Sequence, residues 1–326
     1  MEEAEELLHW SDQQEVVSSN SPILFLFRLL VVLPAWLVSF FVLPVGFFYM
    51  VSSRRARNEA RLYQKQLRAY FGRGVPKRIS PFLQVLSFSL CIVEKIEGWM
   101  GKVPFDKIIK HDDDVGALIS QLEAGRGAVV IGSHLGNIEL LRSLSSYDET
   151  GVGRNVPVTA IFEMKSTEQF NKTLCAINPK AGFNVIDPGD IGIETISVLQ
   201  EQVERGGLVV FAADRTSARA RQRCIREEFL GRLADFPYGV FLLAALLNAP
   251  TYFMFGLRTK IWSLFPKYHI FIEKSQVDFH CPRSEREERI LSLCREFVGK
   301  LEKYCRQFPY QWYNFFNFWL TSDGAQ

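Results

Sequence analysis

A run of 25 residues without a charged side chain, from Leu29 to Ser53, constrains this chain more than any other feature. Such a run must be buried in protein or in lipid, and this one is long enough to cross a bilayer. Residues 1–6 are acidic, and no small-residue cleavage site follows the run, so a cleaved signal peptide does not fit. We therefore expect a polar tail at residues 1–22 and a membrane-anchoring segment at residues 23–53.

Two prolines, Pro34 and Pro44, affect how this segment meets the membrane. Each can kink a helix, so a single tilted span and a shallow re-entrant or interfacial helix both fit the sequence; we expect one span. Residues 54–78 then carry nine basic side chains and one acid, Glu59. The positive-inside rule places the remaining chain on the cytoplasmic side of the membrane. These basic residues form either a solvated helix face or a surface that attracts anionic lipid headgroups.

Composition sets the class of the remaining chain. The 326 residues are 48% hydrophobic, enough for one large α/β core plus a membrane element, and we expect a single domain over residues 54–326. The net charge of +2 and the lack of an aromatic-basic cluster argue against a nucleic-acid partner. The six cysteines form no C-x-x-C pair, and His280 with Cys281 completes no zinc spacing, so we expect neither disulfides nor a metal.

Apolar runs alternate with amphipathic segments beyond residue 80. The runs predict strands at 128–131, 156–162, 183–186, 208–212, 251–257 and 268–272. The segments between them predict helices at 114–123, 138–145, 167–178, 191–204, 236–247 and 284–307. This alternation favours an α/β fold with a mostly parallel central sheet flanked by helices, whose active site lies at the carboxyl ends of strands.

Residues 127–142, GAVVIGSHLGNIELLR, place candidate catalytic groups at such a strand end. The apolar run stops at His134, and Glu139 follows five residues later. Two helical side chains at that spacing would point roughly 140° apart, so His134 must precede the helix. Glu139 in the first helical turn would then hold the imidazole, as a carboxylate does in a catalytic triad. Asp214 also directly follows a predicted strand and should lie at the same edge.

This His-x4-acid block resembles the lysophospholipid/glycerolipid acyltransferase superfamily, and the version with Glu is similar to the late acyltransferases of lipid A biosynthesis. Further stretches resemble that branch in the expected order: 208–217 (LVVFAADRTS), 229–239 (FLGRLADFPYG) and 308–319 (FPYQWYNFFNFW). The resemblance implies an enzyme of lipid biosynthesis, bound to the inner (cytoplasmic) membrane, that moves a fatty acyl group from acyl-ACP or acyl-CoA to a hydroxyl of a lipid or glycolipid. His134 would be the general base and Glu139 would fix its tautomer, without a covalent acyl-enzyme and without a cofactor.

Several further residues are candidates for substrate binding. The turn at Gly136 and Asn137, or the side chain of Arg215, would stabilise an oxyanion. Asp214 and Arg215 stand where the lipid A branch carries Asp-Gln and glycerol-phosphate acyltransferases carry Gly-Thr-Arg. Arg215 then either grips a phosphate or pairs with Asp214 to shape the loop. Arg142 binds a ligand phosphate or pairs with an acid, and Arg232 in the Phe-x-Gly loop would face the site.

Two further segments, residues 215–226 and 312–319, each have two interpretations. The arginines between residues 215 and 226 either are solvated or attract an acidic carrier protein or coenzyme A. The aromatic stretch 312–319 forms core packing or a membrane-edge anchor rather than a substrate-binding surface.

A serine esterase that uses Ser133 would need the Gly-x-Ser-x-Gly nucleophile elbow, which is absent because Gly132 directly precedes this serine. A non-catalytic membrane scaffold is the other alternative, and the acceptor lipid, donor chain length and oligomeric state stay open.

Overall fold

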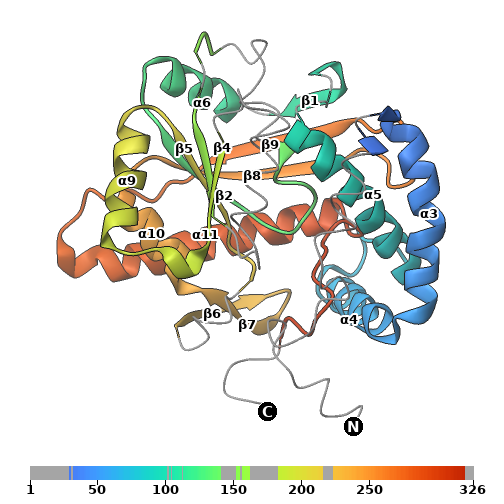
Figure 1. The fold of residues 1–326 in the computed structure, drawn as a ribbon. Helices are drawn as coiled ribbons and strands as arrows, with labels where there is room; N and C mark the ends of the chain where they lie inside the picture. Colours follow the sequence, from blue (N-terminus) through green and yellow to red (C-terminus); the bar gives the residue numbers. More distant parts are fainter. Residues whose placement is uncertain are drawn as a thin grey trace.

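The central sheet has seven strands in the order β1-β9-β8-β2-β5-β3-β4 (Figure 1). The computed structural model describes residues 29–30, 32–100, 103, 105–111, 113–140, 152–154, 156–161, 183–215 and 223–319. The sheet strands are β1 (Ile108–His111), β2 (Ala128–Gly132), β3 (Val158–Ile161), β4 (Phe183–Ile186), β5 (Leu208–Ala212), β8 (Thr251–Arg258) and β9 (Tyr268–Lys274). All neighbours pair in parallel except β8 and β9, which confirms the mostly parallel α/β sheet.

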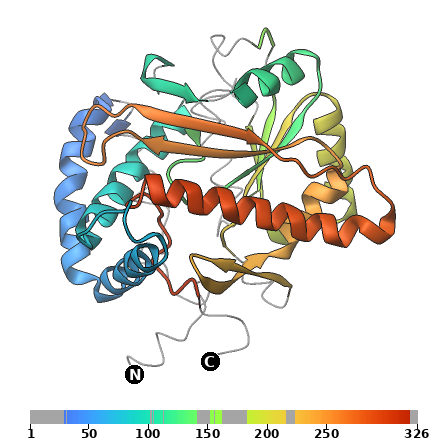
Figure 2. The same cartoon turned by 180° about the vertical axis from the view of Figure 1, so that it is seen from behind.

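Helices cover both faces of this sheet. They are α3 (Ala35–Ser52), α4 (Arg54–Phe71), α5 (Pro81–Met100), α6 (Asp113–Glu123), α9 (Ile193–Glu204), α10 (Tyr238–Leu247) and α11 (Arg286–Gln307). Strand side chains alternate between two cores: in β2, Val129 and Ile131 pack in one, while Ala128 and Val130 pack in the other. The larger core includes residues of α4, α9, α10 and α11, and Figure 2 shows α11 running across that side of the molecule.

The described chain departs from the expected elements at a few places. Strand β1 and the two-stranded hairpin of β6 (Cys224–Phe229) and β7 (Arg232–Pro237) were not expected. The helix expected from residue 236 begins at Tyr238, because β7 continues through Pro237. Of the helix expected at 138–145, residues 138–139 form a turn, and residues from 141 on lie outside the described residues, as does the helix expected at 167–178.

The uncharged N-terminal run forms α3, which starts directly after Pro34 and contains Pro44. It packs against α5 through a small apolar cluster that includes Val38 and Val93. Within the described residues, α3 is the one helix that is long and apolar enough to cross a membrane, by length and composition alone. Such a helix is compatible with a membrane anchor and with a signal sequence.

Candidate functional site

His134 and Asp214 meet at the carboxyl edge of the sheet because their strands are neighbours. Gly132 at the end of β2 pairs with Ala212 at the end of β5, and each candidate residue lies two positions further on. The Asp214 carboxylate accepts hydrogen bonds from the His134 backbone N–H, 2.9 Å to each oxygen, and lies 2.8 Å from Nδ1 of the ring. An ionised carboxylate only accepts, so Nδ1 carries a proton and Nε2 is the basic nitrogen of the neutral ring.

The surroundings of Asp214 hold it rigidly as an anion. Trp312 Nε1 and Asn314 Nδ2 donate to its Oδ2 at 2.9 and 3.1 Å, and its side chain has no exposed surface. The His134 side chain, in contrast, is 28% exposed. No other described residue hydrogen-bonds the imidazole. The arrangement is therefore an oriented base whose Nε2 is available to a ligand.

Burial and nearby charges set the protonation of this pair. Burial lowers the pKa of His134, the positive charge of Arg215 lowers it further, and Asp214 opposes both without reversing the shift. Burial alone would raise the pKa of Asp214, but His134, Arg215 and the Trp312 hydrogen bond outweigh it and lower this pKa overall. At neutral pH, Asp214 is ionised and His134 is a neutral base.

The expected contact between Glu139 and the imidazole is wrong. Glu139 Oε1 instead accepts from Lys95 Nζ at 3.0 Å, and its Oε2 has no partner among the described residues. The reason is that Asp214, arriving from the adjacent strand, already occupies Nδ1 of His134. The backbone N–H of Glu139 donates to Asn137 Oδ1 at 3.1 Å, which fixes the turn that directs Glu139 toward α5.

Lys95 is a site residue that sequence reasoning missed. Its side chain is 25% exposed, and its charge contributes to lowering the pKa of His134. Burial lowers the pKa of Lys95 itself, but the attraction of Glu139 outweighs it and leaves this pKa raised. A signal was present: residues 81–93 of α5 carry no charge, and Glu94 and Lys95 directly follow them. Charged groups in so apolar a segment need a partner or a function.

The loop after β2 is held by main-chain contacts on two sides. Leu135 bridges Trp312, Gly136 N–H donates to the Gln311 carbonyl at 2.8 Å, and Tyr313 N–H donates to the His134 carbonyl at 3.0 Å. On the other side, Asn137 N–H donates to the Gly256 carbonyl of β8 at 2.8 Å.

These bonds contradict the expectation that the amides of this turn stabilise an oxyanion, because both already have carbonyl partners. Two cationic side chains, Lys95 and Arg215, lie close enough for their charges to lower the pKa of His134, and they are the candidates that are left for stabilising an oxyanion there.

The other predicted binding residues fall in different places. Asn137 is buried, and its side chain caps the turn through the Glu139 N–H. Arg215 donates from Nε to Asn314 Oδ1 at 2.7 Å and from Nη2 to the Tyr313 carbonyl at 3.0 Å, so it braces the segment that holds Asp214. Arg232 is exposed beside the hairpin turn, 5.5 Å over the ring of Trp319, and is not in the hydrogen-bonded group around His134. Arg142 lies outside the described residues.

The aromatic stretch near the C-terminus is core, as expected. Trp312, Tyr313, Phe318 and Trp319 are buried, and Trp312 also serves Asp214 as a hydrogen-bond donor. A buried amide chain ties this segment to the N-terminal helices: Gln64 Nε2 donates to Gln84 Oε1 at 2.7 Å, and Gln84 Nε2 donates to the Trp312 carbonyl at 2.6 Å. The site therefore depends on α4 and α5 as well as on the sheet.

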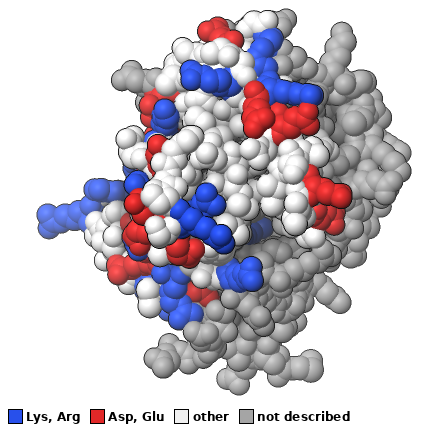
Figure 3. All heavy atoms as spheres, turned by 90° about the vertical axis from the view of Figure 1, so that its left-hand side faces the viewer, with Lys and Arg blue, Asp and Glu red and all other residues white. Residues whose placement is uncertain are grey.

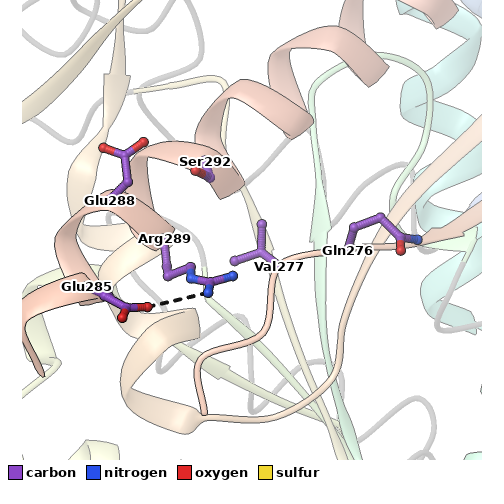
Figure 4. A pocket seen from close by; sticks show the side chains of 6 residues that line it. All are labelled: Gln276, Val277, Glu285, Glu288, Arg289 and Ser292. Carbon is purple, nitrogen blue, oxygen red and sulfur yellow. Dashed lines mark ion pairs between the residues drawn. The ribbon is translucent and has the colours of Figure 1, made fainter. Parts of the chain in front are cut away.

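The described residues include no group of three or more His, Cys, Asp or Glu side chains arranged to hold a metal ion. The described cysteines are free thiols: Cys91, Cys224, Cys281, Cys294 and Cys305. Figure 4 shows a surface pocket near the start of α11, lined by Gln276, Val277, Glu285, Glu288, Arg289 and Ser292. Glu285 and Arg289 pair across it at 3.5 Å, and it contains none of the residues around His134.

No protein-family model matches the chain, and no curated protein matches it. The geometry around His134 and the resemblance in its sequence blocks are thus the basis for a functional proposal.

Proposed function

We propose that the chain is a membrane-bound acyltransferase that moves a fatty acyl group from an acyl thioester to a hydroxyl of a lipid or glycolipid. The observation that supports this most is the His134 imidazole, whose Nδ1 is fixed by the buried Asp214 and whose Nε2 has no partner within the described part of the chain. An imidazole held in this way is a general base aimed at a ligand. The order of the four sequence blocks supports the acyltransferase superfamily.

In the proposed reaction, Nε2 of His134 removes the proton of the acceptor hydroxyl as that oxygen attacks the thioester carbonyl. The new C–O bond forms, the C–S bond breaks, and the imidazolium returns the proton to the thiolate that leaves. Asp214 stabilises the imidazolium and keeps Nδ1 protonated, the role first expected of Glu139. Such base catalysis accelerates a reaction by about 10² to 10⁴-fold.

The side chains beside His134 favour direct transfer over an acyl-enzyme. Ser133 is buried, and its hydroxyl accepts from the Leu135 N–H at 3.1 Å. Cys91 is buried, its thiol lies 3.6 Å from the Gly136 carbonyl, and burial raises its pKa far above neutrality. Neither group hydrogen-bonds the imidazole, so the nucleophile is expected to come from the substrate. The apolar helix α3, packed against the helix that carries Lys95, favours a lipid as that substrate.

The experiment compares total lipids, by mass spectrometry, from cells that express wild type, His134→Ala or His280→Ala at matched membrane levels. His280 is the control because its Nδ1 also lies 2.8 Å from an aspartate oxygen, that of Asp278, but on the exposed surface. We expect one lipid class to gain an acyl mass with wild type and His280→Ala only.

A matching assay measures thiol release by the purified wild type from acyl-CoA and acyl-ACP, with and without added lipid. Unchanged lipids together with no thiol release would overturn the proposal in favour of a non-catalytic scaffold. Release of free fatty acid in place of an acylated lipid would indicate an esterase.

A further inference from the structure

Exposed large apolar side chains concentrate along one flank of the molecule. Most are on residues 32–51, one begins α5, and two lie in the loop between β8 and β9. We call this set the apolar flank: Val32, Trp36, Phe40, Phe41, Val45, Phe47, Phe48, Val51, Phe82, Trp262 and Phe265. Trp262 and Phe265 are 63% and 66% exposed, although they are more than 200 residues away from α3 in the sequence.

Ring contacts make the apolar flank continuous. Near the start of α3, Trp36 stacks on Phe265 with ring centres 6.2 Å apart. Near its end, Phe47 meets Phe82 edge-on, also at 6.2 Å. The β8–β9 loop and the start of α5 therefore extend the apolar surface of α3 at its two ends.

Helix α3 lies alongside the domain over its whole length (Figure 1). Its first half packs in a cluster with Val93 and Ile96 of α5, and Gly46 lies against Ser89 so closely that a Cβ would come within 2.4 Å of the Ser89 hydroxyl. The last turn is capped by Arg57 of α4, which donates to the Met50 carbonyl at 2.6 Å. Both ends are thus fixed to the polar domain.

That packing excludes a spanning orientation for this conformation. An 18-residue helix is about 27 Å long, close to the thickness of a bilayer core. If α3 stood across the bilayer, the β8–β9 loop and helix α4 would lie at opposite membrane surfaces, and the domain packed along α3 would be drawn into the hydrocarbon between them. Each charged side chain that the domain exposes at that depth would cost several kcal/mol to bury in lipid.

The charges around the apolar flank match an anionic lipid surface. The loop segment 259–267 (TKIWSLFPK) places two exposed lysines, Lys260 and Lys267, on either side of its apolar tip and contains no acid. At the other end, Arg54 and Arg61 of α4 are exposed. Lysine and arginine beside tryptophan at an apolar surface are typical of membrane interfaces. In contrast, Figure 3 shows acidic and basic side chains interspersed on the face turned away from α3.

We propose that α3 lies in the plane of one leaflet of an anionic bilayer, and that Trp262 and Phe265 form a second membrane contact beside it. The proposal replaces the single span expected from the sequence and places the N-terminal tail on the same side of the membrane as the sheet. It concerns membrane contact alone, so the His134→Ala variant should bind membranes as the wild type does.

The first experiment tests the orientation of α3 with an epitope tag at the N-terminus of the full chain. Sealed inverted inner-membrane vesicles are treated with protease before and after detergent. An in-plane α3 exposes both the tag and the domain to protease before detergent is added. A tag that is protected until detergent is added, while the domain is cleaved, would show a span and overturn the proposal.

The second experiment tests the loop with a Trp262→Ser/Phe265→Ser variant and vesicles of phosphatidylcholine with or without phosphatidylglycerol. The control is Ile193→Ser/Val198→Ser, which removes two exposed apolar residues from α9. We expect the loop variant to bind about tenfold more weakly and the control to bind as wild type does. Equal binding of all three would refute the loop contact. Unchanged vesicle binding with loss of a dimer in detergent would assign the surface to a second copy of the chain.

Discussion

At the residue scale, the charges around His134 predict opposite pH shifts for two substitutions. Asp214 raises the pKa of His134 and Arg215 lowers it. In Asp214→Asn, activity should fall about 10²-fold or more, because the imidazolium loses its counter-ion. The acid limb of kcat/KM should move to lower pH, since the ring protonates less readily. In Arg215→Met the acid limb should move to higher pH. Shifts in the same direction would contradict the assigned charges.

Glu139 and Lys95 give a second prediction at this scale. Asp214 holds the imidazole and Glu139 holds Lys95, so Glu139→Gln should reduce kcat/KM less than Asp214→Asn. Lys95→Met should reduce kcat/KM about 10²-fold if its ammonium contacts the developing oxyanion or a donor phosphate. It should also lower Tm, because the Glu139 carboxylate loses its ion-pair partner. A larger loss from Glu139→Gln than from Asp214→Asn would return the orienting role to Glu139.

At the element scale, the loop that carries His134 is positioned by the close approach of two glycines. Gly136 has φ +76°, and a Cβ there would lie 2.1 Å from the Gly256 carbonyl of β8. Gly136→Ala should therefore lower the free energy of unfolding by about 1 to 3 kcal/mol and displace the loop, together with His134, from its place beside Asp214. The control is Gly239→Ala in α10, where a Cβ meets nothing within 4 Å and the helix should tolerate it. Urea unfolding and activity of both variants test this, and equal behaviour would contradict it.

The elements also show which parts of the fold can be predicted from local sequence. Strands β2 and β8 are buried throughout and β5 is buried except at Ala212, so their apolar composition predicted them. Strands β6 and β7 pair through residues such as Arg226 with Asp235, and this charged pattern gave no comparable signal.

The same limit applies to the site. His134 and Asp214 were expected at one edge because each follows a strand, and the structure confirms that they meet. The identity of the imidazole's partner depends on β2 and β5 being neighbours, which is a property of strand order and not of either segment. Lys95, Trp312 and Asn314 likewise arrive from distant segments.

At the scale of the whole molecule, the N-terminal helices are packed and hydrogen-bonded to the edge of the sheet that carries His134. Helix α5 contacts α3 along one side. It reaches the site through Lys95 with Glu139, through Gln84 with the Trp312 carbonyl, and through Glu94 with Arg258 at the end of β8. The apolar flank is therefore joined to His134 by a continuous set of packed and hydrogen-bonded groups, so the proposed lipid contact would fix the orientation of His134 relative to the bilayer.

The Glu94–Arg258 pair gives this packing a testable pH dependence. Both side chains are 3% exposed and lie 3.0 Å apart, and burial raises the pKa of Glu94 to about 7 despite the attraction of Arg258. This pKa lies above the ordinary value of 4.5, so the folded protein binds the Glu94 proton more tightly than the unfolded chain does. The resulting contribution of Glu94 to the free energy of unfolding is present at low pH and is lost as the pH rises toward 7.

Arg258→Met removes the compensating charge, so it should destabilise the detergent-solubilised protein by about 3 to 5 kcal/mol at pH 8. The loss in free energy of unfolding should be smaller at pH 5, because a protonated Glu94 needs no counter-ion. Adding Glu94→Gln to this variant should recover most of the stability that it loses at pH 8 and should change its stability little at pH 5. Urea unfolding at the two pH values measures both effects, and a deficit that is equal at pH 5 and pH 8 would show that Arg258 acts through packing and not through its charge.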